Sequence, residues 1–254
     1  MCRRNFGAWV LPKSVAAIYK SVVSTFRGSL DVLSSVLMFD EVAERYKESL
    51  ERNHRFIPGN VEFYSEYKVR IAAEIHTGQC DSILDYGCGV GLSLPHLKRY
   101  FPKARIHAHD PSIKSIEVAQ KNYHYVNFDI SQGKFDLIFV AGVMHHIPRE
   151  TLQMEISKIF GLLSEKGKLV IFEHNPYNPV TRRLVSTCEF DVGAELISTQ
   201  ELINQFNKAG HPLEIAKKGY CLFFPPALKA LSFCERYMRK LPFGGQYFVQ
   251  FKKI

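Results

Sequence analysis

Three glycines at alternate positions follow an apolar run at residues 82–91 (SILDYGCGVG), and this segment constrains the fold most. The apolar run predicts a strand, and residues 92–100 after it have the pattern of a helix. Glycines just past a strand let the backbone turn sharply and approach a ligand that any side chain would block. The segment therefore predicts a nucleotide-type cofactor bound at a strand-to-helix turn.

Strand and helix patterns alternate along the chain after this turn. Apolar or alternating runs predict seven strands, at residues 82–86, 105–109, 125–128, 135–140, 168–172, 213–224 and 247–252. Amphipathic runs predict a helix that ends near residue 76 and others at residues 92–100, 112–122, 150–163, 199–209 and 227–240. We expect an α/β fold, a three-layer sandwich with a seven-stranded, mostly parallel sheet whose last strand is antiparallel.

The spacing of the glycines distinguishes between two classes of cofactor. A dinucleotide site has its last glycine three positions after the second, but here Gly91 follows Gly89 by two, and Leu92 stands where that motif needs glycine. A carboxylate, Asp85, also lies two residues before Gly87. It would repel a pyrophosphate and attract a ligand that carries an ammonium and a sulfonium. The form Asp-x-Gly-x-Gly-x-Gly therefore favours a cationic cofactor.

At these residues the chain resembles the class I S-adenosylmethionine-dependent methyltransferases, over about residues 39–254 and most densely over residues 82–175. The resemblance implies a Rossmann-like fold and S-adenosyl-L-methionine as cofactor. In that family the glycine turn passes the methionine part, acids after the second and third strands hold the ribose and the adenine, and the end of the fourth strand lies near the methyl group. The cofactor-binding residues implied here are Asp85, Gly87, Gly89, Asp110, Asp129, Ile130 and Ala141.

Each of the three acids has a simpler explanation when it is taken alone. Asp85 would cap the following helix, Asp110 would form an Asx turn before Pro111, and Asp129 would be a solvated loop acid. Taken together they follow three successive predicted strands, and Asp110 lies about twenty residues past the glycine turn, as a ribose-binding acid should. Their order therefore favours the cofactor site.

Two histidines, His145 and His146 in the run VMHHIP, follow the fourth predicted strand. Folds of this kind present groups to the substrate at that place. Methyl transfer is an in-line displacement, and a base is needed when the acceptor is a hydroxyl. Neutral imidazole near pH 7 suits that role, so we predict His145 and His146 as catalytic residues, with simple packing as the alternative.

Histidines at two other places are also candidates for a chemical role. Glu173 and His174 end the fifth predicted strand and face the same cleft, where hydrogen bonds that shape the loop are the alternative to catalysis. His107 and His109 alternate on the second strand and so share a face, but no nearby cysteine or further histidine completes a metal site. We expect no metal.

Two segments near the C-terminus, residues 220–228 and 241–247, are strongly apolar and aromatic. They predict core packing of the last strands or, alternatively, an apolar wall for a substrate or a contact with a membrane surface. The run EHNPYNP at residues 173–179 resembles a bacterial subgroup of small-molecule or lipid- and glycan-linked methyltransferases. We therefore expect a small-molecule acceptor, with a lipid- or glycan-linked one as the narrower hypothesis, methylated at oxygen.

The first thirty residues are basic and contain no acid. We interpret residues 1–38 as a basic N-terminal leader or amphipathic extension, ahead of a methyltransferase domain at residues 39–254. Such composition is typical of a membrane-surface helix, which would give peripheral membrane contact through residues 1–30, or of an organelle transit peptide. A loosely docked leader, or a natural chain that starts at Met38, is the simpler alternative. Lys and Ser interrupt the apolar run too often for a bilayer span.

Six scattered cysteines without a CxxC pair predict reduced thiols and a cytoplasmic location, with membrane association as an open alternative. The net charge of +8 permits RNA or protein methylation as a second function, but no RNA-binding module is recognised, so nucleic acid is not the favoured partner. A nicotinamide-dependent oxidoreductase is disfavoured by Leu92 and Asp85. A catalytically idle cofactor-binding protein stays open, as does the oligomeric state.

Overall fold

The computed structural model describes residues 40, 43, 61–131 and 133–254, so the leader predicted at residues 1–38 lies outside the described residues. The helices are α3 (Val61–Ile75), α4 (Leu94–Tyr100), α5 (Ile113–Asn122), α6 (Arg149–Leu162), α7 (Pro179–Thr187), α8 (Thr199–Lys208) and α9 (Glu235–Met238). The strands are β1 (Ser82–Tyr86), β2 (Arg105–His109), β3 (Phe135–Ala141), β4 (Leu163–His174), β5 (Leu213–Cys221) and β6 (Gln246–Lys253). Short 3-10 helices are η3 (Met144–His146), η4 (Glu189–Asp191) and η5 (Pro226–Cys234).

The strands form one sheet in the order β2-β1-β3-β4-β6-β5. β1 pairs in parallel with β2 and β3, and β3 pairs in parallel with β4. β6 runs antiparallel to both of its neighbours, β4 and β5. Parallel strands need long crossovers, which the intervening helices provide. The expected α/β fold, with a mostly parallel sheet and an antiparallel last strand, is confirmed.

The prediction of seven strands is wrong for the described residues, because the strand expected at residues 125–128 forms only one bridge to β2. There, Asn127 donates to Ile106 O and accepts from Ala108 N, both at 3.0 Å. The Asn127 side chain then accepts from Asp129 N at 2.9 Å. This local turn competes with further ladder bonds and directs the chain away from the sheet edge.

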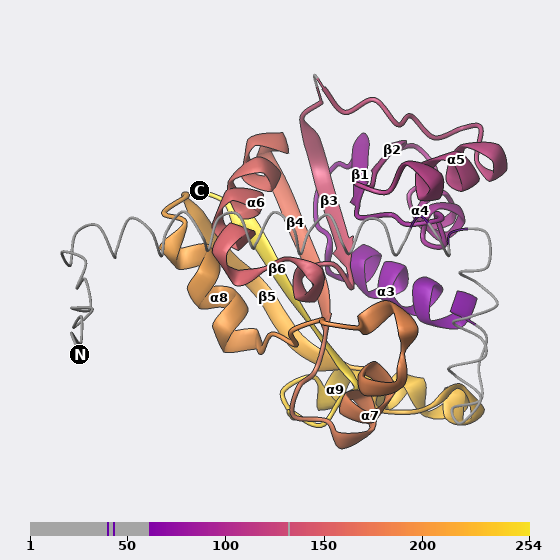
Figure 1. Ribbon diagram of the computed structural model, residues 1–254, viewed down its shortest axis with the longest axis vertical. Coiled ribbons are helices and arrows are strands. Elements are labelled where there is room, and N and C mark those ends of the chain that lie inside the picture. Colours follow the sequence, from indigo (N-terminus) through magenta and orange to yellow (C-terminus); the bar gives the residue numbers. More distant parts are fainter. Residues whose placement is uncertain (1–39, 41–42, 44–60, 132) are drawn as a thin grey trace, which may run out of the picture.

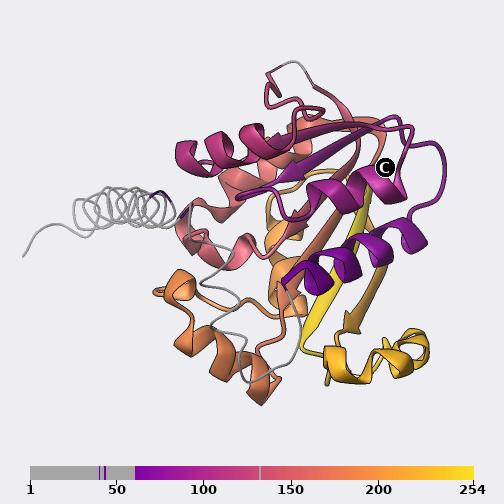
Figure 2. The same ribbon diagram turned by 90° about the vertical axis from the view of Figure 1, so that its right-hand side faces the viewer.

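Helices cover both faces of the sheet (Figures 1 and 2). α3, α4 and α5 pack in one core cluster, and α6 and α8 pack in the other. In β3, Leu137 and Phe139 belong to the first cluster, whereas Ile138 and Val140 belong to the second. All four side chains are fully buried. β3 is therefore covered on both faces, as its continuous apolar sequence predicts.

The last third of the chain departs from its predicted boundaries. β5 ends at Cys221 because Leu222 adopts a left-handed backbone conformation, with φ of 59°. The helix predicted at residues 227–240 is instead η5 followed by α9, with non-helical angles at Leu228. Figure 1 shows α7 and α9 beyond the same end of the sheet, where β4 and β5 finish.

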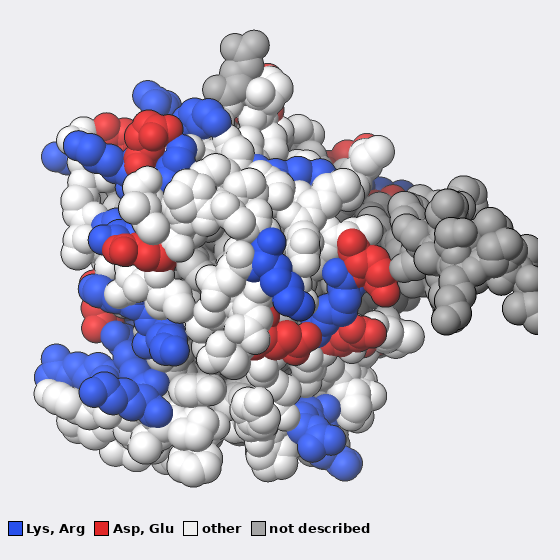
Figure 3. All heavy atoms as spheres, turned by 90° about the vertical axis from the view of Figure 1, so that its left-hand side faces the viewer, with Lys and Arg blue, Asp and Glu red and all other residues white. Residues whose placement is uncertain are grey.

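The surface charge is mixed, and the described cysteines form no disulfide, as predicted. Figure 3 shows Lys and Arg side chains spread over one face with acidic side chains between them. The five cysteines within the described ranges are free thiols. In that part of the chain, no helix combines the length and the apolar character needed to cross a bilayer.

Candidate functional site

A cavity of about 1300 Å³ lies at the carboxyl ends of the parallel strands. Turns after β1, β2, β3 and β4 form its walls, together with α3 and α7. In an open parallel sheet, ligands bind at this edge, where connections leave neighbouring strands toward opposite faces. The predicted site residues that line the cavity are Asp85, Gly87, Gly89, Asp110, Ile130, Ala141, His145 and His146.

The glycine turn brings backbone, rather than side chains, against the cavity. Gly87, Gly89 and Gly91 have φ values of 77°, 52° and 89°, which other residues rarely adopt. A Cβ on Gly87 would lie 2.4 Å from Val143 Cγ2, so the approach of the turn after β3 requires glycine there. A Cβ on Gly89 would meet nothing within 4 Å, so there is open space beside this part of the turn.

Asp110 ties the glycine turn to the end of β2. Its Oδ2 accepts from Gly89 N at 2.8 Å, and its Oδ1 accepts from Ser112 N at 2.9 Å. Burial raises the pKa of the Asp110 carboxyl, and these two N–H groups act against that rise. The Asx-type bond that was the alternative explanation is thus present. Each oxygen still has a second lone pair, so Asp110 can also accept from the hydroxyls of a ribose.

Two opposite charges, Asp85 in β1 and Lys68 in α3, line the cavity beside this turn. Asp85 is 2% exposed, and its Oδ2 has no hydrogen-bond partner among the described residues. Burial raises the pKa of Asp85 to about 7, although Lys68 acts in the opposite direction. Burial likewise lowers the pKa of Lys68. Such a pair suits a zwitterionic ligand, because an unpaired buried charge is costly. Lys68 carried no sequence signal and was missed.

The two predicted adenine contacts lie in different places. Ile130 lines the cavity, as expected. Asp129 is exposed, outside the cavity wall, and its Oδ1 accepts from Ser131 N at 2.9 Å, which lowers the pKa of Asp129. This is the solvated loop acid that was the alternative explanation. A contact between Asp129 and adenine stays a prediction, and it requires the carboxylate to turn toward the cavity.

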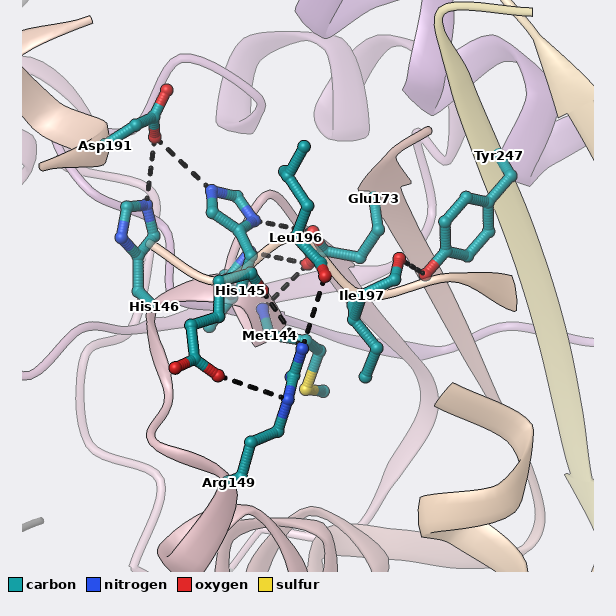
Figure 4. A network of polar contacts seen from close by, with 11 residues as sticks. Met144, His145, His146, Arg149, Glu173, Asp191, Leu196, Ile197 and Tyr247 are labelled. Carbon is teal, nitrogen blue, oxygen red and sulfur yellow. Dashed lines mark hydrogen bonds and ion pairs between the residues drawn. The ribbon is translucent and has the colours of Figure 1, made fainter. Parts of the chain in front are cut away.

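A buried group of polar side chains follows β3 and β4 (Figure 4). The Oε1 atom of Glu173 accepts from Val143 N at 3.0 Å and from Met144 N at 2.7 Å. Its Oε2 lies 2.6 Å from His145 Nδ1. Both side chains of this Glu173–His145 pair are at most 1% exposed. Glu173 therefore fixes the imidazole of His145 and leaves Nε2 as its other polar atom.

Asp191 in η4 contacts both predicted catalytic histidines (Figure 4). Its Oδ1 lies 3.4 Å from His145 Nε2 and 3.5 Å from His146 Nε2. Burial opposes protonation of His145, but the charges of Glu173 and Asp191 outweigh it and raise the pKa of that imidazole to about 10. Burial lowers the pKa of His146 to about 3 and that of His174 to about 4, and the charge on His145 adds to both. The group thus combines two carboxylates with one charged and two neutral imidazoles.

Long-range contacts hold Asp191 in this position. Glu195 N donates to His145 O at 2.9 Å, and the Arg149 guanidinium donates to Glu195 O at 3.2 Å. The Tyr247 hydroxyl donates at 2.8 Å to the backbone carbonyl of Ile197, in the segment that follows Asp191 (Figure 4). Asp191 belongs to no motif and is distant from the histidines in sequence, so sequence analysis missed it.

Apolar side chains form most of the remaining wall. They come from α7 and from the segment after β5, and they are Val180, Leu184, Val185, Leu222, Phe223, Phe224 and Pro225. The apolar run at residues 220–228 therefore supplies both core, through the buried Cys221, and cavity wall. Asn175 Nδ2 donates to Pro242 O and Gly244 O. These hydrogen bonds shape the adjoining loop, which is the role given above as the alternative to catalysis at the end of β4.

Known proteins resemble this chain in sequence and in fold. A family model described as "Methyltransferase domain" matches residues 43–214. A SAM-dependent methyltransferase from Thermotoga maritima superposes with a TM-score of 0.60 and 17% identity, over 87% of this chain and 100% of that one. The plantazolicin methyltransferase BpumL, in complex with a monoazolic desmethylPZN analog and SAH, gives 0.58 and 17%, over 91% and 99%. An uncharacterized protein of Rickettsia prowazekii is 25% identical over 193 residues, which are 66% of this chain and 76% of that protein.

Proposed function

The chain belongs to the methyltransferase domain family and is an S-adenosylmethionine-dependent methyltransferase of class I; from that premise we propose that it methylates a hydroxyl oxygen of a small molecule bound in the cavity. The observation that carries the proposal is that the two sides of this one cavity have different kinds of side chains. Charges that match a zwitterionic cofactor lie beside the glycine turn, whereas an acid–base cluster and an apolar wall lie beyond β3 and β4.

The residues beside the glycine turn fit S-adenosylmethionine. Asp85 Oδ2, which lacks a partner among the described residues, would accept from the α-ammonium, and Lys68 would pair with the α-carboxylate. Asp110 would accept from the ribose hydroxyls, while Ile130 and Ala141 would contact the adenine and the methyl end. A pyrophosphate would instead place its charge against Asp85, which disfavours NAD. When bound, the cofactor supplies an electrophilic methyl group on a positively charged sulfur.

The polar cluster supports oxygen as the acceptor atom. A hydroxyl is a weak nucleophile unless its proton is removed during methyl transfer, whereas a neutral amine can attack without losing a proton first. His145, His146 and Asp191 line the cavity, and the neutral His146 and ionised Asp191 are the groups able to accept that proton, because His145 is already charged. Glu173 acts as a positioning residue, because it fixes the His145 ring from the side that faces the protein interior.

The size and lining of the cavity support a small apolar acceptor. Its volume of about 1300 Å³ exceeds the roughly 300–1,000 Å³ usual for a site that holds one ligand, so a second molecule can share it. Phe223 and Phe224 give the wall an apolar character that suits an organic or lipid-linked acceptor. RNA would instead need a continuous basic track, and the face in Figure 3 mixes both signs of charge.

Calorimetry on the full chain tests the cofactor half of the proposal. We expect S-adenosylmethionine and S-adenosylhomocysteine to bind and NAD to show no heat. Lys68→Met should weaken binding of S-adenosylhomocysteine about tenfold or more, because it removes a charge-assisted bond. Lys121→Met, at an exposed lysine of α5, is the matched control and should bind like the wild type. Binding of NAD without any response to S-adenosylhomocysteine would contradict the proposal.

A panel of acceptors tests the other half. Pairs of apolar small molecules that differ only in carrying a hydroxyl or an amine are incubated with the chain and S-adenosylmethionine. Release of S-adenosylhomocysteine is then measured. We expect turnover to follow the hydroxyl member of each pair, and turnover confined to the amines would overturn oxygen as the acceptor atom.

A further inference from the structure

Three atoms of the kind that bind metal ions converge on one point at the acceptor side of the cavity. One ligand atom each from His145, His146 and Asp191 lie within 4.8 Å of one another, and Asp191 Oδ1 lies near Nε2 of both histidines. We propose that these three atoms bind one divalent transition-metal cation of the zinc class, which contacts the acceptor oxygen. The proposal rests on the methyl-transfer function proposed above, and it departs from the sequence-based expectation of no metal.

The separations within the group distinguish a cation site from an ordinary hydrogen-bonded network. Charge-assisted hydrogen bonds measure about 2.7–2.9 Å, and the contact between His145 Nδ1 and Glu173 is as short as 2.6 Å. The two contacts of Asp191 Oδ1 are much longer, at 3.4 and 3.5 Å. Two ligands that each lie about 2.0–2.1 Å from a tetrahedral zinc are about 3.3–3.4 Å apart. These two of the three separations in the group therefore have the length of the edges of a coordination tetrahedron.

The support behind His145 also has the form that metal sites use. A histidine that binds a metal through one ring nitrogen usually donates from the other nitrogen to a carboxylate, which fixes its tautomer. Glu173 occupies that position on Nδ1, and Val143 N and Met144 N hold Glu173 in turn. A cation would displace the proton that the charged imidazole holds on Nε2, the atom that faces Asp191 (Figure 4), while the proton on Nδ1 stays with Glu173.

The histidine pair on β2 provides an internal comparison. His107 packs against Phe135 and His109 packs against Tyr86, with ring centroids 5.0 and 5.2 Å apart. Neither takes part in a cluster of three metal-ligating side chains among the described residues. The spacing of two residues on a strand thus gives no site, whereas the consecutive histidines of η3 share one carboxylate.

Two imidazoles and one carboxylate are a ligand set typical of catalytic zinc, and they leave a coordination position open. All three residues line the cavity, and the two histidines closely follow the end of β3 at Ala141. A hydroxyl that contacts the cation loses its proton more readily. Because the three side chains would then be occupied by the cation, the proton of the O–H bond would leave to water and not to them, while an O–C bond would form as the C–S bond of the cofactor breaks. One alcohol and one S-adenosylmethionine give a methyl ether, S-adenosylhomocysteine and a proton.

Metal titration of the full chain tests the proposal. After treatment with a chelator, Zn²⁺ is titrated by calorimetry and Co²⁺ by its visible absorption. We expect one ion per chain and the intense absorption of tetrahedral Co²⁺. Asp191→Asn and His146→Asn should each abolish this spectrum. Glu173→Gln should weaken binding about 10–100-fold, as the loss of an outer-shell partner does. Glu189→Gln, an exposed acid in the same turn η4, is the matched control and should bind like the wild type.

The metal binding of a variant is compared only where its thermal unfolding matches that of the wild type. Two ligand substitutions are used, so that the test still works if one of the two variants does not fold. Absence of a tetrahedral Co²⁺ spectrum in the wild type, or an equal spectrum in both ligand variants, would overturn the proposal. Binding of S-adenosylhomocysteine to the chelated protein separates the two hypotheses. If it binds and hydroxyl turnover persists without metal, the cation site is refuted while the methyltransferase function stands.

Discussion

The cofactor side and the acceptor side of the cavity are built in different ways. Beside the glycine turn, Asp110 accepts from backbone N–H groups of a residue near in sequence and of the turn that follows the neighbouring strand β1. On the acceptor side, the Glu173 side chain accepts from the backbone of the turn after β3. Asp191, in a turn that follows α7, contacts the His145 side chain. The first side depends on backbone geometry, whereas the second depends on side chains that only the folded topology brings together.

This difference predicts different responses to substitution. Backbone N–H groups remain in place when a nearby side chain changes, so variants beside the glycine turn should lose ligand affinity and keep their fold. Buried side chains that satisfy one another cannot be removed singly without leaving a partner unsatisfied. Variants on the acceptor side should therefore lose stability as well as activity.

The largest effect is expected for Glu173→Ala. It removes the acceptor for two backbone N–H groups and leaves the His145 charge without its closest carboxylate. Breaking a buried ion pair from one side costs about 3–5 kcal/mol. Urea unfolding at pH 7 should show a free energy of unfolding lower by this amount.

The control for that experiment is Glu189→Ala, which removes an exposed acid from η4. Surface substitutions of this kind change stability by less than about 0.5 kcal/mol. Equal destabilisation by the two variants would show that the acceptor side is not held by Glu173, and the contrast between the two sides would fail.

Gly87→Ala should give the next largest effect, and it tests the one point where the two sides touch. The positive φ costs about 1–2 kcal/mol for any L side chain, and the new methyl would collide with Val143, so a loss of about 2–3 kcal/mol is expected. Gly89→Ala carries only the strain, because its Cβ meets open space. Unfolding experiments on both variants should rank Gly87→Ala as the more destabilised, and the reverse order would contradict the packing.

The same contrast explains how far the sequence predicted the structure. The glycine turn and the acid of β2 were predictable, because the spacing of Gly87, Gly89 and Asp110 directly reflects a local backbone path. The strand expected at residues 125–128 does not form, because a side-chain turn at Asn127 competes with the hydrogen bonds of the sheet. The apolar pattern of the sequence does not indicate this turn. Lys68 and Asp191 were missed because each is a polar residue made significant only by tertiary contacts.

Asp110→Asn should reduce cofactor affinity while leaving the fold intact. The amide keeps one acceptor oxygen for the backbone but loses the charge, and a hydrogen bond to a charged group is worth about 1.5–3 kcal/mol. We expect S-adenosylhomocysteine to bind roughly 10–100-fold more weakly by calorimetry.

Asp129→Asn is the informative comparison. Because Asp129 lies outside the cavity wall, its amide variant should bind within about twofold of the wild type, a change of about 0.4 kcal/mol. A large effect there would show that its carboxylate turns inward onto the adenine.

The smallest effect is a pH dependence that belongs to the cofactor side alone. Burial raises the pKa of Asp85 to about 7, so in the absence of ligand this carboxyl gains its charge only as the pH rises through neutrality. The α-ammonium of the cofactor favours the charged form. Affinity for S-adenosylhomocysteine should therefore rise between pH 5.5 and 7.5, by at most about tenfold per pH unit, and then level off. Asp85→Asn should bind more weakly and lose this slope.

The same group gives the stability of the free protein an opposite slope. Between the ordinary pKa of an aspartate and about 7, folded Asp85 holds a proton that the unfolded chain has released, so its contribution to stability falls as the pH rises. Ligand affinity and the Asp85 contribution to the unfolding free energy should thus move in opposite directions over one pH range, and both contributions should disappear in Asp85→Asn, while the contributions of the shifted histidines to stability remain. A shared cause in the histidine cluster would instead leave both slopes in that variant, because His145 and Glu173 are unchanged in it. The paired measurement therefore decides whether the charge that responds to the cofactor lies beside the glycine turn.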